Sequence, residues 1–148
     1  WGESEDNPPF SQEDLDFIMA AYNLNLDQIH LADMAENREV KNPFLADKIA
    51  PEHRKIDTTL RGLARRKVGS AIAVPLSGQH PATDALRGKS GALFDRAYIA
   101  AAREGERKDI TLFYKEAAAG HSHMLRRFAD SELPALRSNL ELLRKNRN

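Results

Sequence analysis

The chain is organised around residues 93–120, which read LFDRAYIAAAREGERKDITLFYKEAAAG. Apolar side chains recur there at spacings of three and four, which places them on one stripe of a helix. The members of this stripe are Ile99, Ala102, Glu106, Ile110, Phe113 and Ala117. Glu106 is a carboxylate within an apolar seam, where an unpaired charge costs several kcal/mol. We therefore expect Glu106 to face a polar partner inside a helical protein.

The composition fits one soluble domain. The chain has 148 residues, a length typical of a single domain with a substantial core. The absence of cysteine excludes disulfides, thiolate metal sites and cysteine nucleophiles. No apolar run reaches the roughly 18 residues that span a bilayer, so we expect no transmembrane segment. The chain starts at Trp1 without a basic and apolar leader, and we expect a processed product.

Charge is unevenly distributed along the chain although the net charge is zero. Residues 1–40 contain ten acids and one base, and residues 41–148 contain twelve acids and 21 bases. A nucleic-acid-binding domain is usually basic overall, so this pattern argues against a nucleic-acid partner. We expect an acidic first helix whose ion pairs with basic neighbours contribute no more than about 1 kcal/mol each where exposed.

The first helix is predicted to begin close to the N-terminus. Residues 1–10 are acidic and polar and contain two adjacent prolines, so we expect a flexible lead-in. Ser11 and Asp14 then form a capping-box-like start for a helix that runs to about residue 36. Its apolar residues form an inward stripe of Leu15, Ile18, Tyr22, Leu26 and Ile29, and an outer stripe of Phe10, Phe17, Leu24 and Leu31. The outer stripe needs a cover of its own.

A second helix and a long crossover follow. Asn42-Pro43 forms a good start for a helix that runs to about residue 67, with a kink expected at Pro51. From residue 68 to 91, glycines and prolines interrupt the pattern and leave room for a short helical turn near residues 82–86. We expect the apolar run Ala71–Leu76 to cover the outer stripe of the first helix. A partner protein or a membrane surface is the alternative use of this run.

The last two helices complete an all-α, four-helix bundle. One runs from about Ala92 to Ala119 and ends at Gly120, and Ser122 can cap the helix that follows, in which a kink is expected at Pro134. Tight links within each pair of helices and the long central connection give two helical hairpins joined by a crossover. Ferritin-like bundles have this connectivity, and we expect residues 11–148 to form one domain.

Six short motifs occur in a recognisable order. They are Phe17–Ala21, Glu52-His53, Phe94–Ile99, Leu112-Phe113, Arg127–Ala129 and Leu133–Leu136. This ordered set resembles the bacterial ferritin-like family catalogued as domain of unknown function 4142, over roughly residues 12–143. Because members of that family are typically exported, the resemblance implies a periplasmic or secreted protein.

The resemblance also implies inward-facing metal ligands, which this chain keeps only in part. Similar proteins tend to carry a glutamate at the position of Gln28, acid–His pairs at Glu52-His53 and at Gly105-Glu106, and a histidine at Asn139. Only Glu52-His53 is intact here. A di-iron bundle needs several carboxylates and usually two Glu-x-x-His motifs. This chain contains no Glu-x-x-His motif. Ferroxidase chemistry is therefore not expected.

The expected polar cluster consists of Gln28, Glu52, His53, Glu106 and Asn139. We predict that Glu106 approaches His53 or Glu52 as a remnant of the related metal sites, with no catalytic residue and no cofactor. The resulting hypothesis is a non-catalytic binding or structural module of the bacterial envelope, whose partner is an unidentified protein or envelope component.

The alternative is a divalent-metal site with a smaller set of ligands, namely His53, Glu52 and Glu106. His121 and His123, at the turn between the last two helices, could also hold a divalent ion weakly, or could form an ordinary solvated turn.

Overall fold

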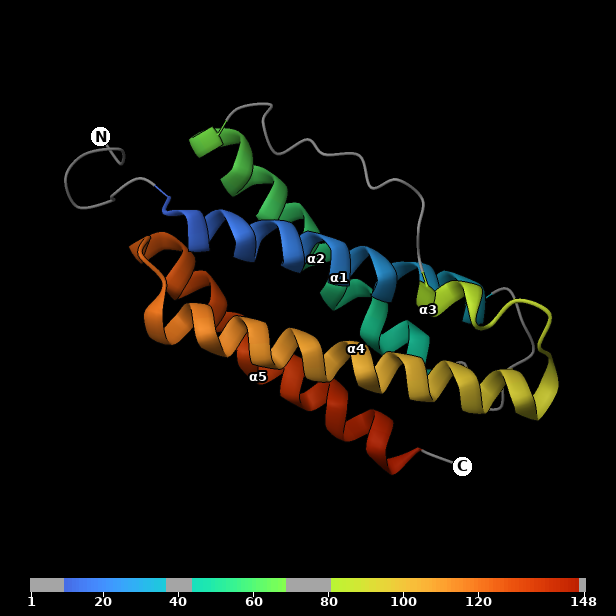
Figure 1. Ribbon diagram of the computed structural model, residues 1–148. Coiled ribbons are helices and arrows are strands. Elements are labelled where there is room, and N and C mark those ends of the chain that lie inside the picture. Colours follow the sequence, from blue (N-terminus) through green and yellow to red (C-terminus); the bar gives the residue numbers. More distant parts are fainter. Residues whose placement is uncertain (1–9, 37–43, 69–80, 147–148) are drawn as a thin grey trace.

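The fold is a bundle of long helices, shown in Figure 1. The computed structural model describes residues 10–36, 44–68 and 81–146. Its helices are α1 (Gln12–Glu36), α2 (Phe44–Val68), α3 (Pro81–Asp84), α4 (Gly91–Ala119) and α5 (His123–Lys145). The described residues contain no strand, which confirms the predicted all-α bundle. None of the described helices is long and apolar enough to cross a membrane.

The long helices pack as two hairpins. Helix α1 packs along α2 and α4 packs along α5, while further contacts join α1 to α4 and α2 to α5. The short helix α3 occupies the position of the expected helical turn and contacts α1. Helices α2 and α5 continue through Pro51 and Pro134. Residues 1–9 of the expected lead-in over residues 1–10, the Asn42-Pro43 start and the Ala71–Leu76 cover lie outside the described residues.

Side-chain caps fix the starts of α1 and α5 as the sequence predicts. At α1 the Asp14 amide donates to Ser11 Oγ at 3.1 Å, and the Ser11 amide donates to Asp14 Oδ2 at 3.0 Å. This reciprocal pair satisfies two amides that have no partner within the helix. At α5 the Leu125 amide donates to Ser122 Oγ at 3.3 Å.

Asp14 also ties the start of α1 to the turn between α4 and α5. Its buried carboxylate accepts from the amides of His121 and Ser122, both at 3.0 Å. Burial alone would raise the pKa of Asp14, but its hydrogen bonds to Glu116 and these backbone amides hold that pKa below its ordinary value. Burial and the hydrogen bond to Asp14 raise the pKa of Glu116 to about 8. Gly120 has an ordinary φ of −62°, and glycine is needed there because a Cβ would clash with the Glu116 carboxylate.

The predicted division of α1 into an inward and an outer stripe is wrong. Ile18 is the only member of the expected inward stripe that is fully buried. Phe17 and Leu31, expected on the outer stripe, are buried core residues, and the rings of Phe17 and Phe113 lie 5.0 Å apart. The buried residues of α1 form a stripe that lies between the two expected stripes, so the bundle itself covers Phe17 and Leu31.

The apolar core is divided into two clusters along the bundle. One cluster contains Phe17, Ile56, Phe113 and Leu136, and the other contains Leu31, Ile49 and Ala102, each together with their neighbours. Every long helix contributes to both clusters. Between them, each of these helices carries buried polar residues, namely Asn25, Gln28, His53, Glu106, Asp109 and Asn139. The bundle therefore has a polar layer between two apolar halves.

Candidate functional site

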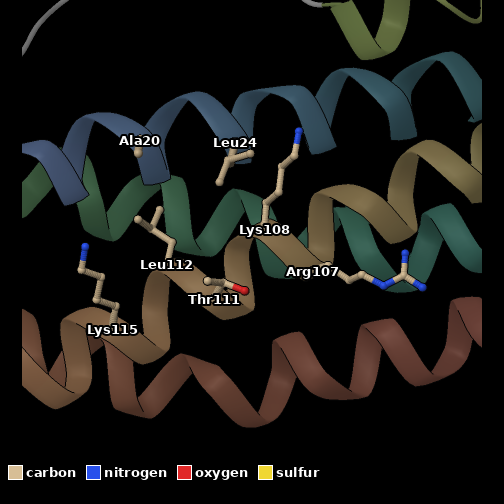
Figure 2. Close-up of a pocket in the computed structure, with 7 residues that line it drawn as sticks. All are labelled: Ala20, Leu24, Arg107, Lys108, Thr111, Leu112 and Lys115. Atoms are coloured by element: carbon tan, nitrogen blue, oxygen red, sulfur yellow. The ribbon is translucent and has the colours of Figure 1, made fainter.

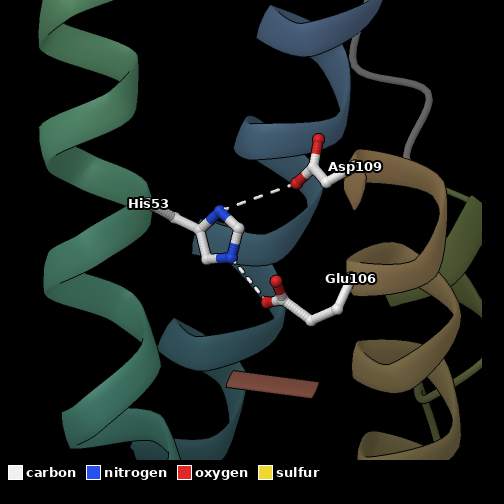
Figure 3. A group of neighbouring side chains, drawn as sticks. All are labelled: His53, Glu106 and Asp109. Atoms are coloured by element: carbon white, nitrogen blue, oxygen red, sulfur yellow. Dashed lines mark hydrogen bonds and ion pairs between the residues drawn. The ribbon is translucent and has the colours of Figure 1, made fainter. Parts of the chain in front are cut away.

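His53 of α2 is the centre of the polar layer. Its side chain is completely buried, and Figure 3 shows the imidazole ring between two carboxylates of α4. Nε2 lies 2.6 Å from Glu106 Oε2, and Nδ1 lies 3.8 Å from Asp109 Oδ2. Glu106 and Asp109 are three residues apart, so they share one face of α4. The ring therefore has a carboxylate beyond each of its two nitrogens.

Asn25 of α1 determines the protonation of the second ring nitrogen of His53, Nδ1. Its Nδ2 donates to the Ala21 carbonyl at 2.7 Å, which directs its Oδ1 toward His53 Nδ1 at 2.6 Å. A carbonyl oxygen accepts only, so His53 Nδ1 carries a hydrogen in this arrangement. The contact with Glu106 requires a second proton, which lies between Nε2 and Oε2. Both ring nitrogens are thus occupied by hydrogen bonds.

The charge of Glu106 favours the imidazolium form of His53. Burial by itself lowers the pKa of His53, but the charge and hydrogen bond of Glu106, with the charges of Asp109 and Glu52, raise it above its ordinary value overall. A charge-assisted hydrogen bond between a buried imidazolium and a carboxylate is strong because water does not screen it. The pair can therefore hold a proton inside the bundle at neutral pH.

Asp109 is the least satisfied member of the cluster. It is completely buried, and neither of its carboxylate oxygens has a hydrogen-bond partner among the described residues. Burial raises its pKa to about 8; the charge of His53 opposes this rise, and the charges of Glu106 and Asp27 add to it. Asp109 therefore keeps its proton to a higher pH than an ordinary aspartate does.

Gln28 lies beside the cluster and interacts with the backbone of α4. Its Nε2 donates to the Ala102 carbonyl at 3.0 Å. A Cβ at position 105 would clash with the Gln28 amide, so Gly105 makes room for this side chain. Gln28 therefore joins α1 to α4, and no hydrogen bond connects it to His53 in the described part of the chain.

Glu52 belongs to a second acidic group, at the contact of α2 with α5. Lys55 lies 3.9 Å from both Glu52 and Glu132. Burial and the nearby Glu52 raise the pKa of Glu132 to about 7. Asn139 of α5 is buried within the polar layer, and its Nδ2 has no hydrogen-bond partner among the described residues. Of the five residues expected to cluster, only His53 and Glu106 hydrogen-bond to each other.

Sequence reasoning missed Asn25 and Asp109. Asp109 follows Glu106 by three residues, so the helical period would have placed both on one face. Asn25 lies outside the apolar stripes from which the inward face of the first helix was predicted. The buried residues between those stripes are small or polar and leave no apolar signal.

His53, Glu106 and Asp109 form the only group of metal-ligand residues found in the described ranges. One ligand atom from each residue lies within 4.8 Å of the other two. The fit to a metal is poor, however, because Nδ1 and Nε2 point in opposite directions and one ion can coordinate only one of them. His121 and His123 are exposed and lie outside this group.

A surface groove between α1 and α4 lies apart from the cluster. Figure 2 shows this groove, which has a volume of about 440 Å³, with Ala20, Leu24 and Leu112 as its apolar residues. Arg107, Lys108, Thr111 and Lys115 provide its polar side. None of the cluster residues lines the groove.

The comparisons with known proteins give one match. The family described as Domain of unknown function (DUF4142) matches residues 2–145. No curated protein and no solved structure shows a significant match to the chain. Because the family match covers nearly the whole sequence, the chain belongs to the DUF4142 family.

Proposed function

We propose that this protein is a non-catalytic binding or structural module of the bacterial envelope, built as a ferritin-like bundle. Its polar layer holds a proton at the level where related proteins would hold a metal ion. The two-hairpin arrangement of the long helices supports the ferritin-like assignment. The resemblance to exported bacterial proteins supports the periplasmic or secreted location.

The occupation of both His53 ring nitrogens carries this proposal. A metal ligand must offer a nitrogen lone pair, but Nδ1 faces Asn25 and Nε2 faces Glu106, each at 2.6 Å. Metal binding has to displace one of these protons inside a closed core. A single imidazole with two carboxylates also gives fewer donors than the usual four of a stable zinc site.

Calorimetric titration of the full chain, freed of metal with a chelator and lacking a histidine tag, tests the proposal. Zinc, manganese and ferrous ions should show no binding tighter than micromolar. Glu106→Gln keeps the size of the side chain and removes its charge, and a His121→Ala/His123→Ala double variant controls for weak binding at the turn. Submicromolar binding that is lost in Glu106→Gln and kept in the double variant would overturn the proposal.

The second candidate function is divalent-metal binding at His53, Glu106 and Asp109. One observation favours it, because Glu106 Oε1 and both Asp109 oxygens are buried without hydrogen-bond partners. Hard cations such as manganese prefer carboxylate oxygens of this kind. In that case His53 would supply one nitrogen, and the ion would neutralise the two carboxylates. The same titration distinguishes the two candidates.

The proposed location has a separate test. Fractionation of the producing bacterium, followed by immunodetection, should place the protein in the periplasm or the culture medium. Recovery with the cytoplasmic marker alone would contradict the envelope assignment and leave the interpretation of the polar layer unaffected.

A further inference from the structure

The outer edge of α5 carries an alternating charge pattern. Arg126, Asp130, Arg137 and Glu141 are all exposed. At 100° per residue they fall within about 60° of one another, so they form one stripe about 22 Å long. Arg126, Asp130 and Arg137 make no ion pair with any described residue, and Glu141 makes only a long contact of 3.9 Å with Arg144. The stripe therefore offers unpaired charges of both signs.

A groove with both apolar and charged lining residues lies at the centre of this stripe. It has a volume of about 420 Å³ and runs between α4 and α5, with Tyr114, Ala117, Leu133 and Pro134 among its lining residues. Asp130 and Arg137 also line it. Tyr114 is 60% exposed and, with Leu93, is one of two exposed large hydrophobic residues in the described part of the chain. This face thus combines an exposed aromatic ring with opposite charges beyond it.

The charge pattern is complementary to itself under a two-fold rotation. Asp130 and Arg137 lie at equal distances from a point between Leu133 and Pro134, and Arg126 and Glu141 lie at equal distances from the same point. When a second α5 packs antiparallel across this point, each acid meets a base of the partner, which gives four ion pairs. An isologous dimer requires this relation, in which residue i contacts residue j and j contacts i.

We infer that this face of α4 and α5 is the interface of a two-fold symmetric dimer of the chain. Tyr114 packs near Pro134 of the second copy at the centre, and the ion pairs set the antiparallel register. A stable dimer buries about 800 Å² on each partner, so the contact extends beyond the groove along both helices. Because exposed ion pairs contribute little energy and are screened by salt, the dimer dissociates on dilution and at high ionic strength.

Charge reversal provides the test. Sedimentation velocity of the full chain should show a concentration-dependent dimer. Arg137→Asp alone and Asp130→Arg alone place like charges opposite each other and should reduce the association constant by at least tenfold. The double variant Asp130→Arg/Arg137→Asp restores opposite charges in every central pair and should recover most of the association. Lys108→Asp carries the same charge change as Arg137→Asp, outside this face, and should leave association unchanged.

Two results would overturn the inference. The first is a wild-type chain that stays monomeric at the highest soluble concentration. The second is a double variant that is helical by circular dichroism but associates no better than the single variants. A dimer that all four variants leave unchanged would place the interface elsewhere and would also reject this face.

Discussion

Replacing Asp109 with asparagine tests the protonation state of the polar layer. The pKa of Asp109, raised by burial from 3.8 to about 8, means that the folded chain keeps a proton that the unfolded chain releases. The stability contributed by this protonated group is fully present below about pH 4 and is lost as the pH rises through about 8. Asparagine has nearly the same shape and cannot ionise. Asp109→Asn should therefore resemble the wild type in acid and be the more stable protein at alkaline pH.

The size of the effect follows from the two pKa values and the burial of Asp109. Each pH unit between the folded and unfolded pKa corresponds to about 1.4 kcal/mol, so ionisation of a rigid Asp109 sets an upper bound of about 6 kcal/mol. The His53 ring, 3.8 Å away, can move toward an ionised Asp109 and lower this cost. We expect the free energy of unfolding of Asp109→Asn to exceed that of the wild type by about 1–3 kcal/mol at about pH 9.

Urea denaturation followed by far-ultraviolet circular dichroism measures this difference. Both proteins are unfolded in chelator-containing buffer at several pH values between about 5 and 9. Asp16→Asn is the control, because Asp16 is an exposed carboxylate of α1 and its replacement should give no comparable pH-dependent gain. If Asp109→Asn destabilises the protein equally across the whole range, Asp109 is ionised and paired with His53, and the reasoning above is wrong.

Three further predictions concern single contacts, and a fourth concerns the effect of salt. His53→Ala should lower the free energy of unfolding by about 3–5 kcal/mol in urea denaturation at neutral pH, because it leaves the Glu106 charge buried without a partner. Gly105→Ala should lower it by about 1–3 kcal/mol, since the new Cβ clashes with the Gln28 amide, and a Gln28→Ala/Gly105→Ala double variant should recover part of the loss. Asp33→Asn should cost less than about 1 kcal/mol because the Arg54–Asp33 ion pair, although 2.7 Å long, is about half exposed. The melting temperature of the wild type should also fall modestly between low and moderate sodium chloride, and an unchanged or raised value would contradict a favourable charge arrangement.

Helix boundaries could be predicted because their signals are local. Ser11 and Asp14 at the start of α1, and Ser122 at the start of α5, satisfy backbone amides one turn away, so the sequence spacing is enough to identify them. The approach of Glu106 to His53 needed a second argument. The helical period aims Glu106 inward, but only the family resemblance placed it level with a residue of α2.

The inward face of α1 could not be read from hydrophobicity alone. Phe17 and Leu31 are apolar and buried, but the residues between them along the buried stripe are Ala21, Asn25 and Gln28. A helical period that is judged from apolar residues does not reveal Asn25 and Gln28, although the polar layer contains both of them. Burial of Asn25 is explained only by the contacts that its amide makes with Ala21 and with His53 of another helix.

Two pairs of residues in the polar layer are coupled, Gln28 with Gly105 and His53 with Glu106. At position 105 the Gln28 amide occupies the space that a side chain larger than glycine would need. At the next position Glu106 supplies the charge that keeps His53 protonated. Glu106→His alone would remove this charge and place a second imidazole beside His53, while Gly105→Asp alone would clash with Gln28. Introducing a metal site at this level therefore requires concerted changes at Gln28, Gly105 and Glu106, because a larger residue at position 105 clashes with Gln28 and a change at position 106 removes the partner of His53.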